Sequence, residues 1–347
     1  MDETVKVAVV GASGYSGEEL VGLLLRHPRV ELVCVTSRSE AGRRLEDVYP
    51  RFRDARRASL PGFIAPDVSA ILASGARFVF LALPHGLAAE FAQPLIAAGV
   101  SVIDLSADFR LREASTYREF YGHDHPAPKL LGQAVYGLPE LHRAYIASAR
   151  LVAAPGCYPT SILLPLAPLL REKLIDPAQI LVSSMSGVSG AGRKAEVAYL
   201  FSELNESAKP YASPKHRHLS EIEQELSLAA GAPVVINFTP HLIPITRGIV
   251  TTIYVTPTAC VTPEKISGAW KHAYGKEPFV RIIEDGERLP EIRHVANTNF
   301  IDLAFRHDPR TGRFILFSAE DNLVKGAAGQ AVQCFNLMAG FAETAGL

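Results

Sequence analysis

Residues 5–17 read VKVAVVGASGYSG, a short β-branched run followed at once by a glycine-rich turn. An apolar-periodic stretch continues over residues 18–26 until His27 and Pro28 end it. This succession predicts a strand, a glycine turn and a helix. A second apolar run at residues 31–35 completes a βαβ unit, which indicates a parallel sheet.

The same alternation of short strands and helical stretches continues to residue 154. Further strand-like runs occupy residues 78–83, 101–105 and 150–154. Apolar strands separated by helices are typical of a parallel sheet that is covered on both faces. We therefore expect a Rossmann-like, doubly wound α/β domain over residues 1–154.

A different pattern begins near residue 155, where strand-like runs appear at residues 180–185, 234–239, 249–256, 300–305 and 314–319. The last two have no helix between them, which predicts a second α+β domain with a mixed or antiparallel sheet over residues 155–319. Ser220 and Glu223 have the spacing of a capping box and predict a helix start. An apolar stretch within residues 320–347 predicts a C-terminal helix that completes the first domain.

Composition excludes several classes of protein. The chain has 347 residues, of which 48% are hydrophobic and 20% charged, so it is neither disordered nor fibrous. The formal charge is −1, which argues against nucleic acid or an anionic membrane surface as the partner. No apolar run reaches the roughly 18 residues of a membrane span, and residues 1–4 are acidic where a signal peptide is basic. We expect a cytoplasmic protein that acts on a small molecule.

The glycines of the first turn indicate a phosphate-binding site. Gly11, Gly14 and Gly17 allow a tight turn and a close approach of backbone N–H groups to a pyrophosphate at a helix N-terminus. We expect the intervening Ser13, Tyr15 and Ser16 to contact the same group. The spacing departs from G-x-G-x-x-G, and a plain strand-to-helix turn is the alternative.

The residues after the second strand favour NADP(H) over NAD. An NAD site places Asp or Glu there to bind the ribose 2′-hydroxyl, but this chain has Ser37 and Arg38. A hydroxyl and a guanidinium suit a 2′-phosphate through charge-assisted hydrogen bonds. The alternative is that Arg38 is only a solvated charge.

Cys157 is the candidate nucleophile. It lies between a strand and an apolar helical run at residues 162–170, where the partial positive charge of a helix N-terminus stabilises a thiolate. Cys34, Cys260 and Cys334 lie within or beside apolar segments and are expected to be structural. The four cysteines are far apart, without a CxxC pair that indicates zinc.

His216 and His218 offer imidazoles to serve as acid or base for the thiol. Two histidines are too few for a closed zinc site, so we expect no metal. A basic surface loop is the alternative role for this segment.

Several motifs in the same order point to one family. They are GASGYSG at residues 11–17, LPHG at 83–86, DLSADFR at 104–110, PGCYPT at 155–160, HRH at 216–218 and NLVKG at 322–326. Together they resemble the N-acetyl-γ-glutamyl-phosphate reductase family, and the match runs nearly from end to end. The resemblance implies NADPH-dependent reduction of an acyl phosphate to an aldehyde in arginine biosynthesis, by a dimer or tetramer.

The resemblance also implies roles for single residues. Cys157 would form a thioester with the substrate, with His216 as the first choice for acid and base and His218 as the second. Arg110 matches a position that binds substrate phosphate. Further contacts with the cofactor are implied for Pro84, Ser189, Gly190 and Asn322. Residues 155–319 would then carry catalysis and oligomerisation.

Three alternatives stay open at this stage. Aspartate-semialdehyde dehydrogenase shares the fold and the cysteine, but it usually carries an arginine and a histidine where this chain has Leu242 and Ile249. A lysine-pathway reductase that acts on a carrier-linked substrate tends to read Gly-Cys-Asn at the cysteine, whereas this chain reads Gly-Cys-Tyr. A non-catalytic NADP-binding sensor is the third, and the intact Cys157 argues against it.

Overall fold

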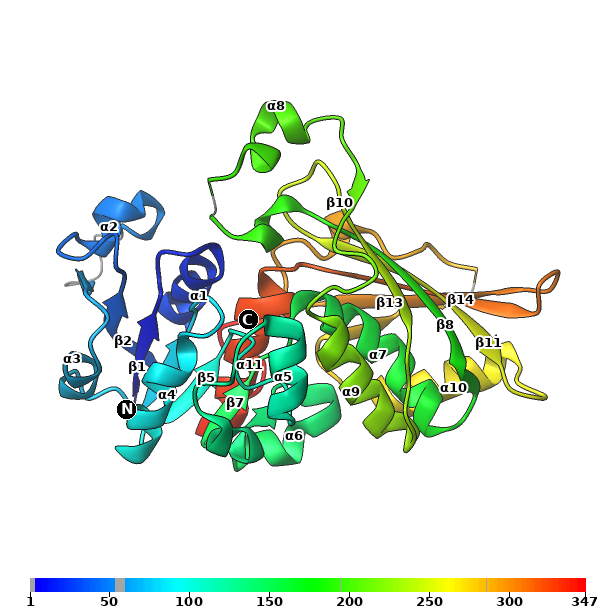
Figure 1. Ribbon diagram of the computed structural model, residues 1–347, viewed down its shortest axis with the longest axis horizontal. Coiled ribbons are helices and arrows are strands. Elements are labelled where there is room, and N and C mark those ends of the chain that lie inside the picture. The colour runs from blue at the N-terminus through cyan, green and yellow to red at the C-terminus, as the bar shows by residue number, and fades with distance from the viewer. Residues whose placement is uncertain (1–3, 54–59, 194, 285) are drawn as a thin grey trace. The chain divides into compact units, whose positions relative to one another are not determined.

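The computed structural model describes residues 4–53, 60–193, 195–284 and 286–347. Residues 1–3, part of the acidic start considered above, lie outside these ranges. The chain divides into two compact units (Figure 1). Unit 1 comprises Met1–Pro155 and Ala327–Leu347, and unit 2 comprises Gly156–Gly326.

The sheet of unit 1 is parallel throughout its described strands, as the sequence predicts. In spatial order these are β3 (Phe63–Ile64), β2 (Val30–Thr36), β1 (Val5–Val10), β4 (Phe78–Leu81), β5 (Ser101–Asp104), β7 (Leu151–Ala153) and β6 (Val135–Tyr136). The helices are α1 (Tyr15–Arg26), α2 (Leu45–Val48), α3 (Val68–Ala73), α4 (Ala88–Ala97), α5 (Ala114–Tyr121), α6 (Pro139–Ala147) and α11 (Gly329–Ala339). The order reverses at β1, so the first strand lies beside both β2 and β4.

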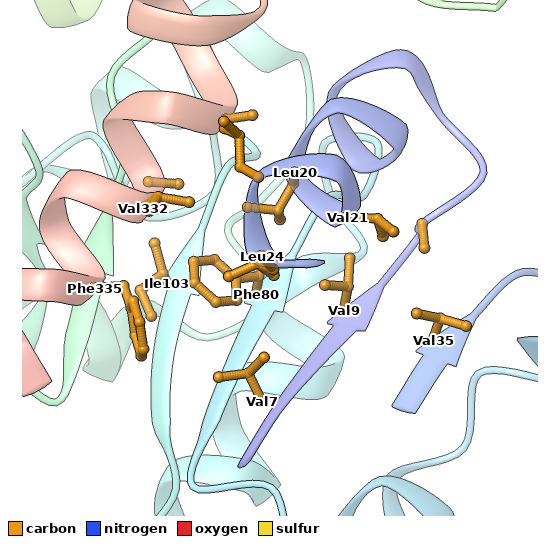
Figure 2. Packing of buried hydrophobic residues seen from close by; sticks show 14 of the residues in the cluster. Val7, Val9, Leu20, Val21, Leu24, Val35, Phe80, Ile103, Val332 and Phe335 are labelled. Carbon is orange, nitrogen blue, oxygen red and sulfur yellow. The ribbon is translucent and has the colours of Figure 1, made fainter. Parts of the chain in front are cut away.

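Alternate residues of the central strands face two separate cores. Val7 and Val9 of β1 pack with Leu20 of α1 and Phe335 of α11 on one face (Figure 2). Ala8 and Val10 face the other core, which α3 and α4 supply. Because helices cover both faces, the described strands are mainly apolar, with exposed charges only near their starts, as at Lys6 and Glu31. The expected doubly wound architecture is confirmed.

The C-terminal helix α11 therefore belongs to unit 1. Residues 320–326, which the sequence pattern grouped with the first domain, belong to unit 2 instead. The physical reason is that β14 (Arg313–Glu320) pairs along its whole length within the second sheet. A short π-helix, Val324–Ala328, then leads into α11.

The second sheet is mixed, as expected. Its described strands follow the order β12 (Val280–Ile282), β13 (Ile301–Asp308), β14, β11 (Ile249–Pro257), β8 (Ile175–Ser186), β10 (Asn237–Leu242) and β9 (Lys209–Pro210). Strands β8 and β10 are parallel, as are β12 and β13, and the other neighbours are antiparallel. The strand expected at residues 234–239 begins only at Asn237.

Helices cover one face of this second sheet (Figure 1). They are α7 (Cys157–Arg171), α9 (Leu219–Ala230) and α10 (Pro263–Tyr274), and a short α8 (Phe201–Leu204) lies between β8 and β9 in the chain. The predicted capping box is wrong, because α9 begins at Leu219 and the Ser220 hydroxyl donates to the carbonyl of Arg217. A Ser inside the first turn cannot act as the N-cap.

Helix α7 carries two prolines in its interior, Pro165 and Pro168. In an α-helix the N–H of each residue donates to the carbonyl four residues before it, and proline has no N–H. The carbonyls of Ser161 and Leu164 therefore lack their intrahelical donors. Side chains of other elements replace them. The Ser318 hydroxyl donates to the Ser161 carbonyl at 2.6 Å, and the Tyr274 hydroxyl donates to the Leu164 carbonyl at 2.8 Å. The helix thus depends on its surroundings for hydrogen bonds.

Candidate functional site

The turn between β1 and α1 requires glycine at two positions. Gly11 has φ +84°, and a Cβ there would lie 2.3 Å from the carbonyl oxygen of Ala82. A Cβ on Gly17 would lie 2.4 Å from the carbonyl oxygen of Gly11. The backbone just after β4 and the turn itself therefore leave no space for side chains at Gly11 and Gly17.

Gly14 differs because it faces open space. It is the N-cap of α1, and a Cβ on it would have only the Gly11 carbonyl oxygen, at 3.8 Å, within 4 Å. The backbone amides of the first turn of α1, those of Tyr15, Ser16 and Gly17, have no acceptor within the helix itself. An open N-terminus with this geometry fits a pyrophosphate. The residues present are therefore compatible with a bound dinucleotide.

The end of β2 is tied to this turn. The N–H of Gly11 donates to Thr36 Oγ1 at 3.3 Å, and the N–H of Ala12 donates to the Thr36 carbonyl at 3.0 Å. These bonds bring Ser13 and Ser37 together, with their hydroxyl oxygens 2.8 Å apart. Arg38 follows and is exposed. Two of the predicted cofactor residues thus contact each other directly, with Arg38 next in the chain.

A buried carboxylate holds the turn that contains Pro84. Asp108 accepts hydrogen bonds from the N–H groups of Gly86 at 2.6 Å, Ala88 at 3.0 Å and Ala89 at 3.3 Å. It thereby completes the N-terminal end of α4 and fixes the exposed Pro84 beside it. Sequence reasoning missed this role, although Asp108 lies in the DLSADFR motif.

Arg110 lies at the carboxyl ends of two neighbouring strands. Its Nε donates to the carbonyl of Ala154 and its Nη2 to the carbonyl of Leu105, both at 2.9 Å. Only 6% of the residue is exposed. Nearby, burial and then the charge of Asp108 raise the pKa of Asp104 to about 7. The guanidinium is therefore held rigidly beside acidic groups of unit 1.

In unit 2, Cys157 is the first residue of α7, and Gly156 is its N-cap. The helix starts five residues before the apolar run at residue 162, so the thiol is closer to the positive end of the helix dipole than the sequence pattern indicated. The side chain is half-buried. A Cβ on Gly326 would lie 2.8 Å from the Cβ of Cys157, so only glycine fits beside the cysteine.

His218 and Glu221 converge on Gly156. Glu221 is 1% exposed, and its Oε2 accepts the N–H of Gly156 at 3.2 Å. A Cβ on Gly156 would lie 2.6 Å from Nε2 of His218 and 2.8 Å from Oε1 of Glu221. An imidazole and a carboxylate therefore lie against the residue that precedes Cys157. Sequence reasoning missed Glu221. It lies in the first turn of α9, three residues after His218, which is the N-cap of that helix.

His216 occupies an aromatic cage instead. Its ring lies 5.4 Å from that of Tyr158, 5.6 Å from that of Tyr211 and 5.7 Å from that of Phe238, measured between centroids. Its Nδ1 accepts the N–H of His218 at 3.1 Å. Burial, with a smaller contribution from the charge of Arg217, lowers the pKa of His216 to about 4. This imidazole is therefore neutral at physiological pH.

The predicted residues Ser189, Gly190 and Asn322 lie together in unit 2. Asn322 Oδ1 accepts the N–H of Gly248 at 2.6 Å, and its Nδ2 donates to Ser189 Oγ at 3.0 Å. A Cβ on Gly190 would lie 3.8 Å from the same Nδ2. The Asn322 amide thus clamps the loop after β8 to the start of β11.

Metal and membrane sites were also considered. In the ranges that the structure describes, no group of three or more His, Cys, Asp and Glu side chains is placed to hold a metal ion. None of the helices formed by those residues combines the length and the apolar character needed to cross a membrane.

Models of two protein families match the chain. The semialdehyde dehydrogenase NAD binding domain matches residues 6–149, and the semialdehyde dehydrogenase dimerisation domain matches residues 157–322. Among solved structures, aspartate semialdehyde dehydrogenase II of Vibrio cholerae, complexed with ASA, has a TM-score of 0.74 at 19% identity and covers 98% of this chain and 99% of its own. The Candida albicans enzyme with NADP has a TM-score of 0.71 at 15% identity, covering 97% and 99%. At these identities the likeness shows the shared fold.

Curated relatives are much closer in sequence. The N-acetyl-gamma-glutamyl-phosphate reductase of Akkermansia muciniphila is 56% identical over 344 residues, which are 99% of this chain and 98% of that protein. The reductase of Citrifermentans bemidjiense is 50% identical over 344 residues, which are again 99% of this chain and 98% of that protein. The resemblance seen in the motifs is therefore confirmed. The chain belongs to the N-acetyl-γ-glutamyl-phosphate reductase family, a family of oxidoreductases with the semialdehyde dehydrogenase fold.

Proposed function

We propose that this protein reduces N-acetyl-L-glutamyl 5-phosphate to N-acetyl-L-glutamate 5-semialdehyde and phosphate with NADPH, a step of arginine biosynthesis. The observation that carries the proposal is the placement of Cys157 at the N-terminus of α7, with His218 and Glu221 against Gly156. The activity of the relatives, which match over 99% of the chain, supports the same reaction.

This geometry supports a route through a thioester. The thiolate of Cys157, stabilised by the helix dipole, attacks the acyl carbon and displaces phosphate, which leaves a thioester. Bound NADPH supplies the hydride that reduces the thioester carbon. His218 then donates a proton to the oxygen of the resulting thiohemiacetal. It takes the proton back as the carbon–sulfur bond breaks, which releases the aldehyde and returns Cys157 to the thiolate.

We assign the acid and base role to His218, reversing the order favoured by the sequence. His218 lies against the residue next to the nucleophile, and Glu221 is close enough to orient its ring. His216 is held in the aromatic cage with its pKa lowered to about 4, so its ring is uncharged near neutral pH and is a weak base. Its contact with the His218 backbone makes it a positioning residue.

For the cofactor, we propose NADP(H) over NAD. The open first turn of α1 would hold the pyrophosphate, and Ser13, Ser37 and Arg38 would hold the 2′-phosphate. Further contacts are proposed for Pro84, Ser189, Gly190 and Asn322. Arg110 is proposed to face the substrate phosphate. In this assignment unit 1 holds the phosphates of the cofactor, and unit 2 supplies further cofactor contacts and carries the nucleophile. The need for a free thiol fits a reducing cytoplasm.

We also propose a homo-oligomer built on the sheet of unit 2. On the face away from α7, Leu181 is 41% exposed, Met185 44% and Tyr254 40%. Tyr254 pairs with Leu181 across neighbouring strands, so these side chains form one apolar patch on β8 and β11. The matched dimerisation domain covers this sheet.

Replacing Cys157 tests the covalent mechanism. Cys157→Ser is expected to lower phosphate-dependent reduction of NADP by N-acetylglutamate semialdehyde by about a thousandfold or more, because a hydroxyl is a far weaker nucleophile. NADPH affinity, measured by fluorescence titration, should stay nearly unchanged. Cys260→Ser, which alters an exposed cysteine, is the control and keeps full activity. An active Cys157→Ser protein would contradict the thioester route.

The two histidines are separated by matched variants. His218→Gln is expected to lower kcat by about a hundredfold and to flatten its pH profile, since the amide cannot exchange a proton near neutrality. His216→Gln should lower kcat by less than about tenfold and keep the profile. Rates are measured over a pH series in the same assay. A larger loss in His216→Gln, with a flattened profile, would return the role to His216.

Cofactor preference depends on the end of β2. The double variant Ser37→Ala with Arg38→Ala is expected to raise KM for NADPH by about tenfold or more while leaving KM for NADH unchanged, because only NADPH carries the 2′-phosphate. Lys129→Ala, which removes an exposed cation elsewhere in unit 1, is the control. Equal losses with both cofactors would remove the argument for NADP.

Oligomeric state is measured by size-exclusion chromatography with light scattering. The wild-type protein is expected to have a mass that is a multiple of 37.5 kDa, the mass of one chain. The double variant Leu181→Glu with Tyr254→Glu is expected to have the mass of a single chain. The two introduced carboxylates would be buried at the interface without partners, which would destabilise the oligomer. Tyr145→Glu, at a site 70% exposed in unit 1, should leave the mass unchanged. A monomeric wild-type protein would overturn this assignment.

A further inference from the structure

A row of buried hydroxyls crosses the centre of the unit 2 sheet beneath α7. It consists of Ser184 on β8, Thr251 on β11 and Ser318 on β14. Thr251 stands directly opposite Ser184 in one ladder and opposite Ser318 in the other. All three residues are 0% exposed. Polar groups are rare in a sheet core, and each needs a hydrogen-bond partner there.

The hydroxyls find those partners in the first turns of α7. Ser318 Oγ donates to the Ser161 carbonyl at 2.6 Å, the carbonyl that Pro165 leaves without its helical donor. A second link runs through the Ser161 side chain. Its Oγ lies 2.9 Å from Thr251 Oγ1, which lies 2.8 Å from Ser184 Oγ.

The direction of this second link follows from the number of protons. Ser161 Oγ donates its single proton to the Tyr158 carbonyl at 2.9 Å. Thr251 must therefore donate to Ser161, and Ser184 must donate to Thr251. The chain of hydrogen bonds runs one way, from β8 through β11 to the carbonyl of Tyr158, which is the residue next to Cys157.

We propose that this row of Ser184, Thr251 and Ser318 positions the nucleophile by fixing the height of the first turns of α7 above the sheet. Apolar packing is non-directional, whereas hydrogen bonds have narrow distance and angle limits. The row binds Ser161 twice, at its carbonyl through Ser318 and at its hydroxyl through Thr251. That hydroxyl in turn donates to the carbonyl of Tyr158, so the bonds reach the residues one and four positions beyond Cys157. The row thereby sets where the thiolate meets the acyl carbon.

The inference rests on the proposed role of Cys157, and these hydroxyls act through α7 rather than on the substrate. Tyr274 provides a matched comparison. Its hydroxyl satisfies the other carbonyl freed by a proline, that of Leu164, which lies about one turn further from Cys157. If the row acted only on stability, loss of the Tyr274 bond and loss of the Ser318 bond would have similar consequences.

The test compares Thr251→Val, Ser318→Ala and Tyr274→Phe in a Cys260→Ser background, so that Cys157 is the accessible thiol while Cys34 and Cys334 stay buried. Three quantities are measured for each variant: the rate of iodoacetamide alkylation as a function of pH, kcat with KM for NADPH, and thermal stability. Fluorescence of Trp270, the single tryptophan of the chain, reports unfolding of unit 2.

Thr251→Val and Ser318→Ala are expected to raise the apparent pKa of Cys157 and to slow its alkylation at neutral pH by about threefold or more. They should lower kcat by about tenfold while KM for NADPH changes by less than about twofold. Tyr274→Phe should lower the unfolding temperature and keep both the alkylation profile and kcat. Thr251→Ser, which retains the hydroxyl, should restore the wild-type profile.

Wild-type alkylation profiles in Thr251→Val and Ser318→Ala, with kcat losses no larger than in Tyr274→Phe, would overturn the proposal. Should Thr251→Val fail to fold, Ser318→Ala alone decides, because it deletes one hydroxyl without altering β11. Alkylation needs neither substrate nor cofactor. A changed profile in a protein that does not reduce the acyl phosphate would therefore keep the positioning role and reject the proposed reaction.

Discussion

The site in unit 2 depends on the close approach of two side chains to a residue that has none. His218 and Glu221 both come within 3 Å of the place where a Cβ of Gly156 would stand. Any larger residue would push the imidazole and the carboxylate away from the start of α7. The same glycine supplies the N–H that Glu221 accepts and serves as the N-cap of the helix that carries Cys157. The absence of a side chain at Gly156 thus brings together the start of the helix that carries Cys157, the His218 ring and the Glu221 carboxylate.

The two units use the same physical device for different purposes. In each, a helix begins directly after a glycine N-cap: Gly14 precedes α1 in unit 1, and Gly156 precedes α7 in unit 2. At α1 the N-cap Gly14 faces open space, which suits a phosphate. At α7 the first helical residue is a cysteine, so the same partial charge acts on a thiol. The identity of one residue decides whether the helix end binds an anion or stabilises one of its own.

Much of this arrangement could be predicted from the sequence. The run from Val5 to Gly17 predicts the central strand and its glycine turn because both depend on local geometry and on apolar periodicity. Cys157 could be singled out for the same reason. The different surroundings of the two histidines could not, because the rings of Tyr211 and Phe238 come to lie against His216 only in the folded chain.

Buried carboxylates were missed for a related reason. Asp108 and Glu221 each bind backbone N–H groups distant in the chain, and the partners of a charged residue cannot be read from its neighbours in sequence. Acidic residues are usually exposed, so composition alone places them on the surface. The capping-box spacing at Ser220 was a local signal that tertiary structure overrode, since α9 begins one residue earlier.

The prolines of α7 have a consequence for the order in which the protein matures. A helix with Pro165 and Pro168 in its interior gains little from its own backbone, and tertiary packing supplies most helical stability. The groups that replace the lost bonds, Tyr274 and Ser318, lie more than one hundred residues further along the chain. On the ribosome, the segment that contains Cys157 emerges long before these partners exist. Cys157 is therefore synthesised well before the strand that contains Ser318 can join the sheet and complete the hydrogen bonds of α7.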